Sequence, residues 1–190
     1  MLEGLSEGDW ERLLGATRTI EDVLRGESSA PAPFFLRRHV PGDMGWVVGR
    51  HGELYFREYG WDKRFEGLVA RIVADFVEGY DPGWERCWIA EANGRNVGCV
   101  FFVKESDEVA KLRLLLVEPE ARGMGLGSRF VEACVRFARE RGYGKLVLWT
   151  TSILTSARCI YEEQGFRLVE EERHHSFGRD LVGQNWEQKL

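Results

Sequence analysis

A glycine-rich turn between a strand-like run and a helix-like run has the residue types of an anion-binding site. It consists of Arg122-Gly123-Met124-Gly125-Leu126-Gly127. Three glycines at alternate positions remove Cβ atoms from the turn, so its backbone N–H groups can approach an anion closely. The helix that follows adds unpaired N–H groups and a partial positive charge, and Arg122 adds a formal charge. The turn therefore predicts a pyrophosphate site that needs no metal, with a purely structural tight turn as the alternative.

Two common nucleotide-binding motifs do not fit this turn. Ser128 stands where the last glycine of the dinucleotide pattern G-x-G-x-x-G would fall. No acidic residue closes the next predicted strand, residues 145–149, to hold a ribose. A P-loop needs Lys followed by Ser or Thr after its last glycine, but Gly127 is followed by Ser128-Arg129. Both of these readings are therefore excluded.

The elements that must position the turn are predicted by hydrophobic periodicity. Helical patterns occupy residues 43–59, 65–77, 125–141 and 153–164, and strand patterns occupy residues 34–38, 86–91, 96–104, 109–117, 145–149, 166–173 and 185–190. The turn Asn93-Gly94 predicts an antiparallel meander. The strand, helix, strand order over residues 109–149 predicts a right-handed parallel crossover. The predicted fold is an α/β (α+β) mixed, mostly antiparallel sheet flanked by helices.

The N-terminal region reads as a separate helix and a linker. Ser6 can cap a helix over residues 6–25, whose apolar stripe contains Trp10, Leu13, Leu14, Thr17 and Leu24. Residues 26–33 are rich in Ser, Pro and Gly and read as a linker. The predicted organisation is a helix in residues 1–25, a linker in 26–33 and one domain in 34–190. Because a lone amphipathic helix cannot bury its stripe, it must dock on the domain, pair with another chain or be the remnant of a lost neighbour. Pairing with another chain makes a homodimer an option.

Composition narrows the class of protein. The chain has 190 residues and a formal charge of -5, which argues against a domain whose main partner is a nucleic acid. Cys87, Cys99, Cys134 and Cys159 have no C-x-x-C spacing, so we expect four buried reduced thiols and no metal site. The N-terminus is polar and acidic, and no run of about 18 apolar residues occurs. We therefore expect a cytoplasmic protein that does not enter a membrane.

Several motifs together resemble the GNAT superfamily of N-acetyltransferases. Arg122-x-x-Gly125-x-Gly127 follows Val117-x-Pro119 and precedes Ala157-x-x-x-Tyr161-x-x-x-Gly165-Phe166. The closest resemblance is to the acetyltransferase half of bacterial MarR–GNAT fusion proteins. It is carried by the segments at residues 41–46, 58–62, 110–119 and 174–178, and it covers roughly residues 34–190. Residues 5–24 are similar to the last helix of a MarR regulator.

The resemblance implies a GNAT-like fold and direct attack of an amine on the thioester of acetyl-CoA. The cofactor's pantetheine arm would lie along one strand and its pyrophosphate on the turn. The cofactor-binding residues implied are Leu115, Leu116, Val117, Arg122, Gly123, Met124, Gly125, Leu126, Gly127, Ser128, Thr151 and Ala157. Thr151 and Ser152 stand where many relatives carry an Asn. Tyr161 matches the general acid, and its unperturbed pKa near ~10 keeps it protonated at neutral pH; an aromatic side chain on an inner helix face is the alternative.

The general base and the acceptor site are less well defined by the sequence. Lys111 stands where some relatives carry a catalytic Glu, which leaves Glu108, Glu118 or a chain of waters as candidates. The substrate-binding candidates are Glu53, Tyr55, Tyr59 and Trp61, although these aromatics could equally cap the core. His174 and His175 are neighbours on a predicted strand and point to opposite faces, so they should not chelate one metal ion.

These features leave the acceptor open among a small amine, an amino acid, an antibiotic and a protein lysine. Two other functions remain open at this stage. A MarR-type transcription regulator would need a recognition helix and a basic wing, for which residues 1–33 are too short. A non-catalytic acyl-CoA sensor would keep the glycine turn and tolerate the loss of Tyr161.

Overall fold

The computed structural model describes residue 17 and residues 33–190. Residues 34–190 make up a compact unit. The predicted N-terminal helix and linker lie outside the described residues, apart from Thr17 and Pro33.

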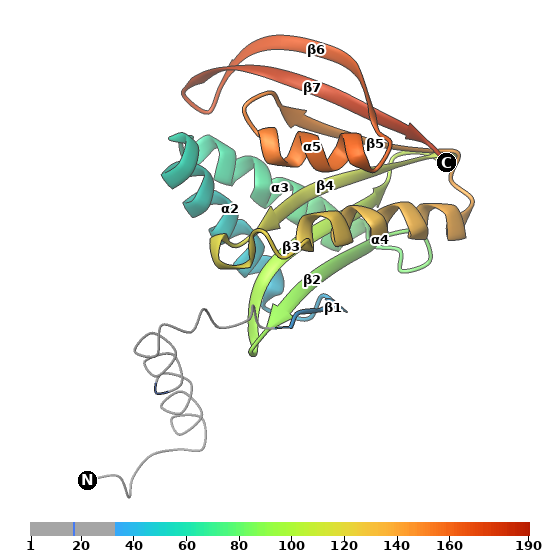
Figure 1. The fold of residues 1–190 in the computed structure, drawn as a ribbon, viewed down its shortest axis with the longest axis horizontal. Coiled ribbons are helices and arrows are strands. Elements are labelled where there is room, and N and C mark those ends of the chain that lie inside the picture. The colour runs from blue at the N-terminus through green and yellow to red at the C-terminus, as the bar shows by residue number, and fades with distance from the viewer. Residues whose placement is uncertain (1–16, 18–32) are drawn as a thin grey trace, which may run out of the picture. The chain divides into compact units, whose positions relative to one another are not determined.

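A seven-stranded sheet organises residues 34–190, in the order β1-β2-β3-β4-β5-β7-β6 (Figure 1). Its strands are β1 Phe35–Arg38, β2 Arg86–Ala92, β3 Arg95–Lys104, β4 Val109–Val117, β5 Lys145–Thr151, β6 Arg167–Ser176 and β7 Arg179–Lys189. Strands β4 and β5 are parallel, and the other neighbouring strands are antiparallel. The predicted meander and the parallel crossover are therefore both present.

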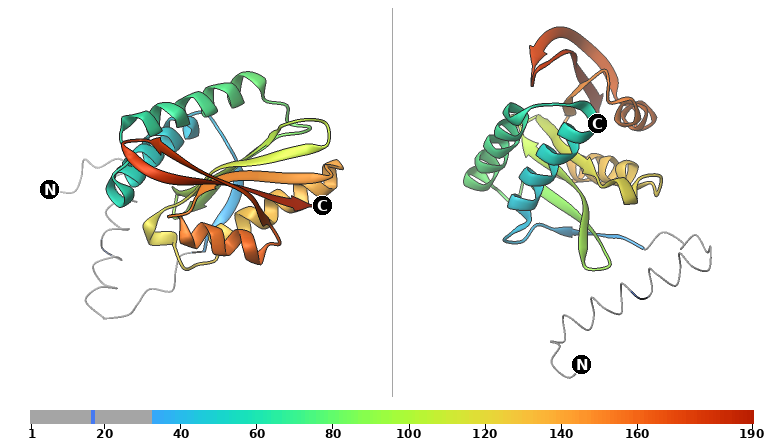
Figure 2. Two further views of the ribbon diagram at one scale, coloured as in Figure 1. Left: turned by 90° about the horizontal axis from the view of Figure 1, so that it is seen from above. Right: turned by 90° about the vertical axis from the view of Figure 1, so that its left-hand side faces the viewer.

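Helices cover the two faces of the sheet. The helices are α2 Asp43–Tyr59, α3 Lys63–Gly79, α4 Leu126–Arg141 and α5 Thr155–Glu163, with a 3-10 turn η1 at Pro119–Ala121. Helices α2 and α3 lie against one face, and α4 and α5 against the other (Figure 2). Each long helix has a stripe of apolar residues at helical spacing, and burying that stripe against the sheet stabilises the helix.

The core between α2, α3 and the meander is rich in aromatic side chains. Trp61, Phe65 and Phe177 pack together, with ring centroids 4.6 to 5.2 Å apart. Phe76 and Phe101 join α3 to β3 at 4.8 Å. Such edge-to-face pairs add to the stability that burial supplies.

The expectation of four buried thiols holds for three of them. Cys87, Cys99 and Cys134 are buried. Cys159 is exposed, which corrects the expectation for that residue. It lies on α5, where Tyr161 is the residue classed as buried, so most of this short helix faces solvent.

Strands β4 and β5 pair along the first half of β4 and then separate. Their register runs from Val109 opposite Lys145 to Leu112 opposite Leu148. Beyond it, none of the strands in the described part of the chain pairs with residues 113–117 on that side. The register between β3 and β4 also shifts here, and Leu114 has a φ of 50°. A leucine in this left-handed region is uncommon, and its strain has to be offset by the surrounding packing.

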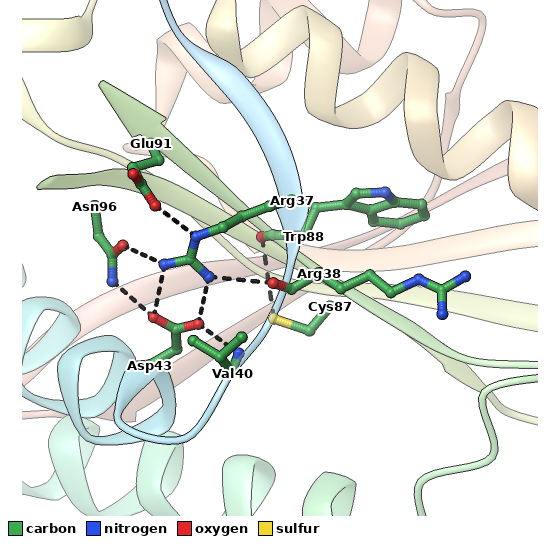
Figure 3. A network of polar contacts seen from close by, with 8 residues as sticks. All are labelled: Arg37, Arg38, Val40, Asp43, Cys87, Trp88, Glu91 and Asn96. Carbon is green, nitrogen blue, oxygen red and sulfur yellow. Dashed lines mark hydrogen bonds and ion pairs between the residues drawn. The ribbon is translucent and has the colours of Figure 1, made fainter. Parts of the chain in front are cut away.

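The start of α2 is held to the sheet by a network of charged side chains (Figure 3). Arg37 on β1 donates to both carboxylate oxygens of Asp43, at 2.6 and 3.0 Å, and to Glu91 at 2.7 Å. Asn96 on β3 donates to Asp43 at 2.9 Å. The network therefore ties β1, β2, β3 and α2 together at one edge of the sheet.

Within residues 33–190, the predicted helices and strands are present with small changes of bounds, and the larger difference is at the C-terminal hairpin. Strand β6 runs on to Ser176, and β7 begins at Arg179 instead of near residue 185. The turn between them has a positive φ at Phe177 and at Gly178, of 56° and 77°. Two positive φ values suit a tight hairpin turn. The polar residues near this turn hid the strand period in the sequence.

Candidate functional site

The glycine turn presents free backbone N–H groups at the start of α4. Gly125 is the N-cap residue, with a φ of 74°, and no side chain caps the helix. Gly123 also has a positive φ, of 77°. A Cβ atom at either position would meet no neighbour within 4 Å, so the space in front of the turn is open. Uncapped N–H groups at a helix start, facing open space, are suited to an anion.

A cleft of about 570 Å3, the glycine-loop cleft, begins at this turn. The C-terminal half of α2, the end of β4, the turn with the start of α4, and α5 with the residues before it form its walls. Ten predicted cofactor residues line it: Leu115, Leu116, Val117, Arg122, Gly123, Gly125, Leu126, Gly127, Ser128 and Ala157. The cleft therefore joins the glycine turn to the stretch of β4 that β5 leaves unpaired.

Gly127 and Arg122 have additional structural roles in the turn. A Cβ atom on Gly127 would lie 2.7 Å from Cδ1 of Ile160, so this glycine allows α4 and α5 to pack closely. Arg122 forms an ion pair with Glu58 at 2.6 Å, and its Nε donates to the carbonyl oxygen of Val117 at 3.3 Å. These contacts orient the guanidinium at the edge of the cleft, and the Glu58 carboxylate partly neutralises its charge.

A second cleft of about 500 Å3, the aromatic cleft, is lined by residues 111–115 of β4. Its walls come from α2, α3, β4, β5, α5, β6 and β7. The residues that line both clefts are Tyr55, Leu115, Leu154 and Ala157. The two clefts thus meet where β4 and β5 separate, which is a geometry that can bring a cofactor and a second substrate together.

Tyr161 lies beside this meeting point. It is 5% exposed and lines the aromatic cleft, one helical turn after Ala157 on α5. Burial raises the pKa of Tyr161 above its usual value, so the phenol keeps its proton at neutral pH. Burial also raises the pKa of Tyr55, to which the nearby Tyr161 phenol contributes. The site therefore holds two protonated phenols near the junction.

The predicted acceptor residues are divided among different places. Tyr55 and Trp61 line the aromatic cleft, whereas Tyr59 lines the glycine-loop cleft. Trp61 is 2% exposed and packs in the core, so it lines the cleft and also caps the core. Glu53 lines neither cleft and pairs instead with Arg50 and Arg57.

The structure does not bring the candidate bases to the junction. Glu108 is exposed in the turn before β4 and lines neither cleft. Glu118 is buried, and Arg50 donates to both of its carboxylate oxygens at 2.6 Å. Two predicted cofactor residues, Met124 and Thr151, also line neither cleft, and the Thr151 side chain is fully buried. These residues lie close in the sequence to residues that line the clefts, and the sequence alone did not show that their own side chains lie elsewhere.

Sequence reasoning missed most of the aromatic cleft. Its walls include His51, Arg113, Leu114, Trp149, His174 and Phe177. The available signal was the alternation along residues 172–176, because Glu172, His174 and Ser176 share the face that lines the cleft. His175 points the other way and pairs with Asp180 at 2.7 Å. The described residues contain no group of three His, Cys, Asp or Glu side chains that could hold a metal ion.

His51 is the most deeply buried titratable group in the wall of the aromatic cleft. Its side chain is 1% exposed, and Nδ1 lies 2.8 Å from the carbonyl oxygen of Val47. Because that carbonyl can only accept, Nδ1 carries the proton, and Nε2 is a buried acceptor that lacks a partner. Burial lowers the pKa of His51 to about 4, so the ring is neutral at physiological pH.

None of the helices in residues 33–190 is long and apolar enough to span a bilayer.

Solved structures with the same fold are acetyltransferases. A putative acetyltransferase of Salmonella typhimurium, solved with its cofactor acetyl-CoA, superposes with a TM-score of 0.66 at 18% identity, over 83% of this chain and 94% of that one. A spermidine N-acetyltransferase of Vibrio cholerae, solved with CoA and spermine, gives a TM-score of 0.63 at 16% identity, over 82% and 95% of the two chains. At these identities the likeness concerns the fold.

Sequence comparison gives the family. Human N-acetyltransferase 8B is 29% identical over 125 residues, which are 63% of this chain and 55% of that protein. N-acetylaspartate synthetase of Xenopus tropicalis is 34% identical over 89 residues, 46% of this chain and 33% of that protein. The chain spans about half the length of the first of these relatives. The family model described as the acetyltransferase (GNAT) family matches residues 46–166, which is more than half of the chain. The chain therefore belongs to the acetyltransferase (GNAT) family.

Proposed function

We propose that this chain is an N-acetyltransferase, which transfers an acetyl group from acetyl-CoA to an amine by direct attack. The observation that carries the proposal is the meeting of the two clefts at Tyr55, Leu115, Leu154 and Ala157. One cleft begins at an anion-binding turn, and the other contains a buried phenol. A cofactor in the first and an amine in the second would meet at the gap between β4 and β5.

The glycine-loop cleft fits the pyrophosphate and the pantetheine arm of acetyl-CoA. The uncapped N–H groups at the start of α4 would bind the pyrophosphate, and Arg122 would stand beside it. Residues 115–117 of β4 line the cleft without a strand partner on the β5 side. Their free backbone groups would bind the amide groups of the pantetheine arm as an added strand would.

Proton transfer is assigned to side chains near the junction. Bound acetyl-CoA would supply the acetyl thioester that the amine attacks. Tyr161 would donate its proton to the departing sulfur, because burial keeps its phenol protonated at neutral pH. Neither Glu108 nor Glu118 stands where it could deprotonate the amine, so we assign that step to water in the aromatic cleft.

The names of similar proteins support the proposal. The relative from human is named an N-acetyltransferase, and the structural neighbours described above were solved with acetyl-CoA or with CoA and spermine. Spermine is an amine, so an amine acceptor is compatible with this fold. A small amine or an amino acid is the acceptor class that a cleft of about 500 Å3 favours over a protein lysine.

A free-thiol release assay tests the proposal. The purified chain is incubated with acetyl-CoA and a panel of amines, amino acids and lysine peptides. Release of CoA thiol with one class of acceptor, together with a product heavier by one acetyl group in mass spectrometry, supports the transferase. CoA that binds in calorimetry without any thiol release across the panel contradicts it and favours the acyl-CoA sensor.

We also propose a closer family relationship, a domain organisation, a cellular compartment and an oligomeric state for this chain. The motifs at residues 110–119 and 174–178 support kinship with the acetyltransferase half of MarR–GNAT proteins, with residues 34–190 as that domain and residues 1–33 as a helix and linker. The absence of disulfides among the four cysteines, all of which lie in the described part, supports a reducing compartment such as the cytoplasm. A homodimer through residues 1–25 is tested by light scattering on the eluting protein.

A further inference from the structure

Arg113 is a partly buried cation in the wall of the aromatic cleft, on strand β4. Within the described part of the chain, its guanidinium has no ion pair and no hydrogen bond. Asp75 on α3 and Glu105 act on it only through longer-range electrostatic attraction. Removing a guanidinium from water without a partner is costly, so a free donor fork in a cleft is suited to a ligand with an anionic group.

The neighbouring cation shows that Arg113 is unusual in this cleft. Lys111 lies on the same strand and lines the same cleft, but its ammonium forms an ion pair with Glu105 at 3.3 Å. The carboxylate among the residues that line the cleft is Glu172 on β6, which is exposed and makes no ion pair with Arg113 in the described structure. Of the two cations on this strand, Arg113 is therefore the one that remains available to a ligand.

The position of Arg113 limits where the anionic group can be on the ligand. Arg113 stands two residues before Leu115 on β4, and Leu115 lines both clefts. A ligand with an amine at the junction and an anionic group on Arg113 therefore carries both groups on one small molecule. An α-amino acid does so, whereas a lysine side chain within a protein carries no carboxylate of its own.

The side of the cleft formed by α3 and its neighbours is apolar. Phe65, Leu68, Val69 and Ile72 come from α3, Trp61 precedes it, and Leu112, Leu114 and Phe177 complete that side, whereas Thr150, Glu172, His174, Ser176 and Asn185 line the opposite side. The apolar side would hold a hydrophobic side chain. The cleft thus places an unpaired cation beside an apolar surface.

We propose that the acceptor is an α-amino acid with an apolar side chain and that Arg113 binds its carboxylate. This inference rests on the proposed acetyl transfer and adds the chemical class of the acceptor. The guanidinium would donate two parallel hydrogen bonds to the carboxylate. The acceptor amine would then be directed toward the junction beside Tyr161.

Matched ligands that differ only in the carboxylate test the inference. Binding of L-phenylalanine and of phenethylamine to the CoA-bound protein is measured by calorimetry, and the pair L-leucine and isoamylamine is measured in the same way. We expect each amino acid to bind at least about tenfold more tightly than its decarboxylated partner, as is typical for hydrogen bonds to a charged group.

Variants assign that preference to one side chain. Arg113→Gln should remove the preference and leave the binding of phenethylamine unchanged, and Arg113→Lys should restore part of it. Lys111→Gln is the matched control, because it removes a charge from the same strand and the same cleft but one that Glu105 already neutralises. We expect it to preserve the preference. Unchanged amine binding also shows that the Arg113→Gln protein is folded.

The outcomes separate this inference from the proposed function. A preference that Arg113→Gln abolishes supports the carboxylate assignment, whether or not thiol is released. Equal binding within each pair, binding of neither member, or a preference that survives Arg113→Gln overturns it. Thiol release with decarboxylated amines alone would uphold acetyl transfer and reject the amino-acid acceptor, and absent thiol release with intact CoA binding would reject the transfer itself.

Discussion

At the scale of single residues, backbone angles decide which glycines of the turn matter for binding. Gly123 and Gly125 have positive φ angles and open space around them, whereas Gly127 is helical and lies against Ile160. All three look equivalent in the sequence. Two therefore shape the turn that we propose to bind the pyrophosphate, and the third permits the packing of α4 on α5.

Gly125→Ala is expected to weaken CoA binding by about tenfold or more, because the left-handed φ of 74° becomes strained and the N–H groups at the start of α4 tilt. Gly142→Ala is the matched control: Gly142 caps the other end of the same helix with a φ of 79° and has equally open surroundings. Both variants should lose about 1 kcal/mol of unfolding free energy. Calorimetry with CoA should separate them, and equal affinities would contradict the assignment of the turn.

Tyr161→Phe is expected to lower kcat by about a hundredfold, because the departing sulfur loses its proton donor, and to leave acetyl-CoA affinity nearly unchanged. Steady-state thiol release and calorimetry measure the two effects. Tyr143→Phe is the control, since Tyr143 is also buried but donates to the carbonyl oxygen of Trp84 and lines neither cleft. A wild-type rate for Tyr161→Phe would remove this residue from the mechanism.

At the scale of elements, the edge of the sheet depends on charge pairing between β1 and α2. Desolvation opposes ionisation of Asp43, but hydrogen bonds from Arg37, from the backbone of Val40 and from Asn96 outweigh it and lower its pKa. A carboxyl group whose pKa is depressed in the folded state stabilises the protein above its unfolded pKa of about 3.9. That stability is lost as the pH falls through the folded pKa.

Asp43→Asn is therefore expected to reduce the unfolding free energy at neutral pH by about 2 kcal/mol, because Arg37 loses its bidentate partner. As the pH falls below about 4, the variant should also lose less unfolding free energy than the wild type does. Urea unfolding at several pH values measures both effects. Asp107→Asn is the control, since its pair with Lys104 is exposed and should change stability little. Parallel pH profiles for Asp43→Asn and the wild type would contradict the argument.

At the scale of the whole molecule, the sheet needs its C-terminal strand more than its position in the sequence suggests. Strand β7 is inserted between β5 and β6, so the last strand in the chain holds the preceding strand in the sheet. Strand β6 in turn contributes His174 and Ser176 to the aromatic cleft. The acceptor side of the site therefore depends on the final residues of the chain.

A protein that begins at residue 34 is expected to fold and to bind CoA as the full chain does, because residues 34–190 form a compact unit with its own core. Thermal unfolding and calorimetry check this expectation. A protein that ends at residue 176 is the opposite case: without β7, strand β6 loses its partner, and cooperative unfolding should disappear. Aggregation or lost CoA affinity in the first protein would contradict the proposed domain boundary.

The sequence by itself determined the glycine turn, the order of strands and helices, and the candidate Tyr161. These features depend on residues close together in the chain, where glycine spacing and apolar periodicity act directly. Only the tertiary structure decided that β4 and β5 separate after Leu112, that two clefts meet there, and that Glu108 and Glu53 lie elsewhere. It also left Arg113, among residues 33–190, without an ion pair or hydrogen bond beside an apolar side of the cleft. These features depend on contacts between distant segments, which local patterns do not encode.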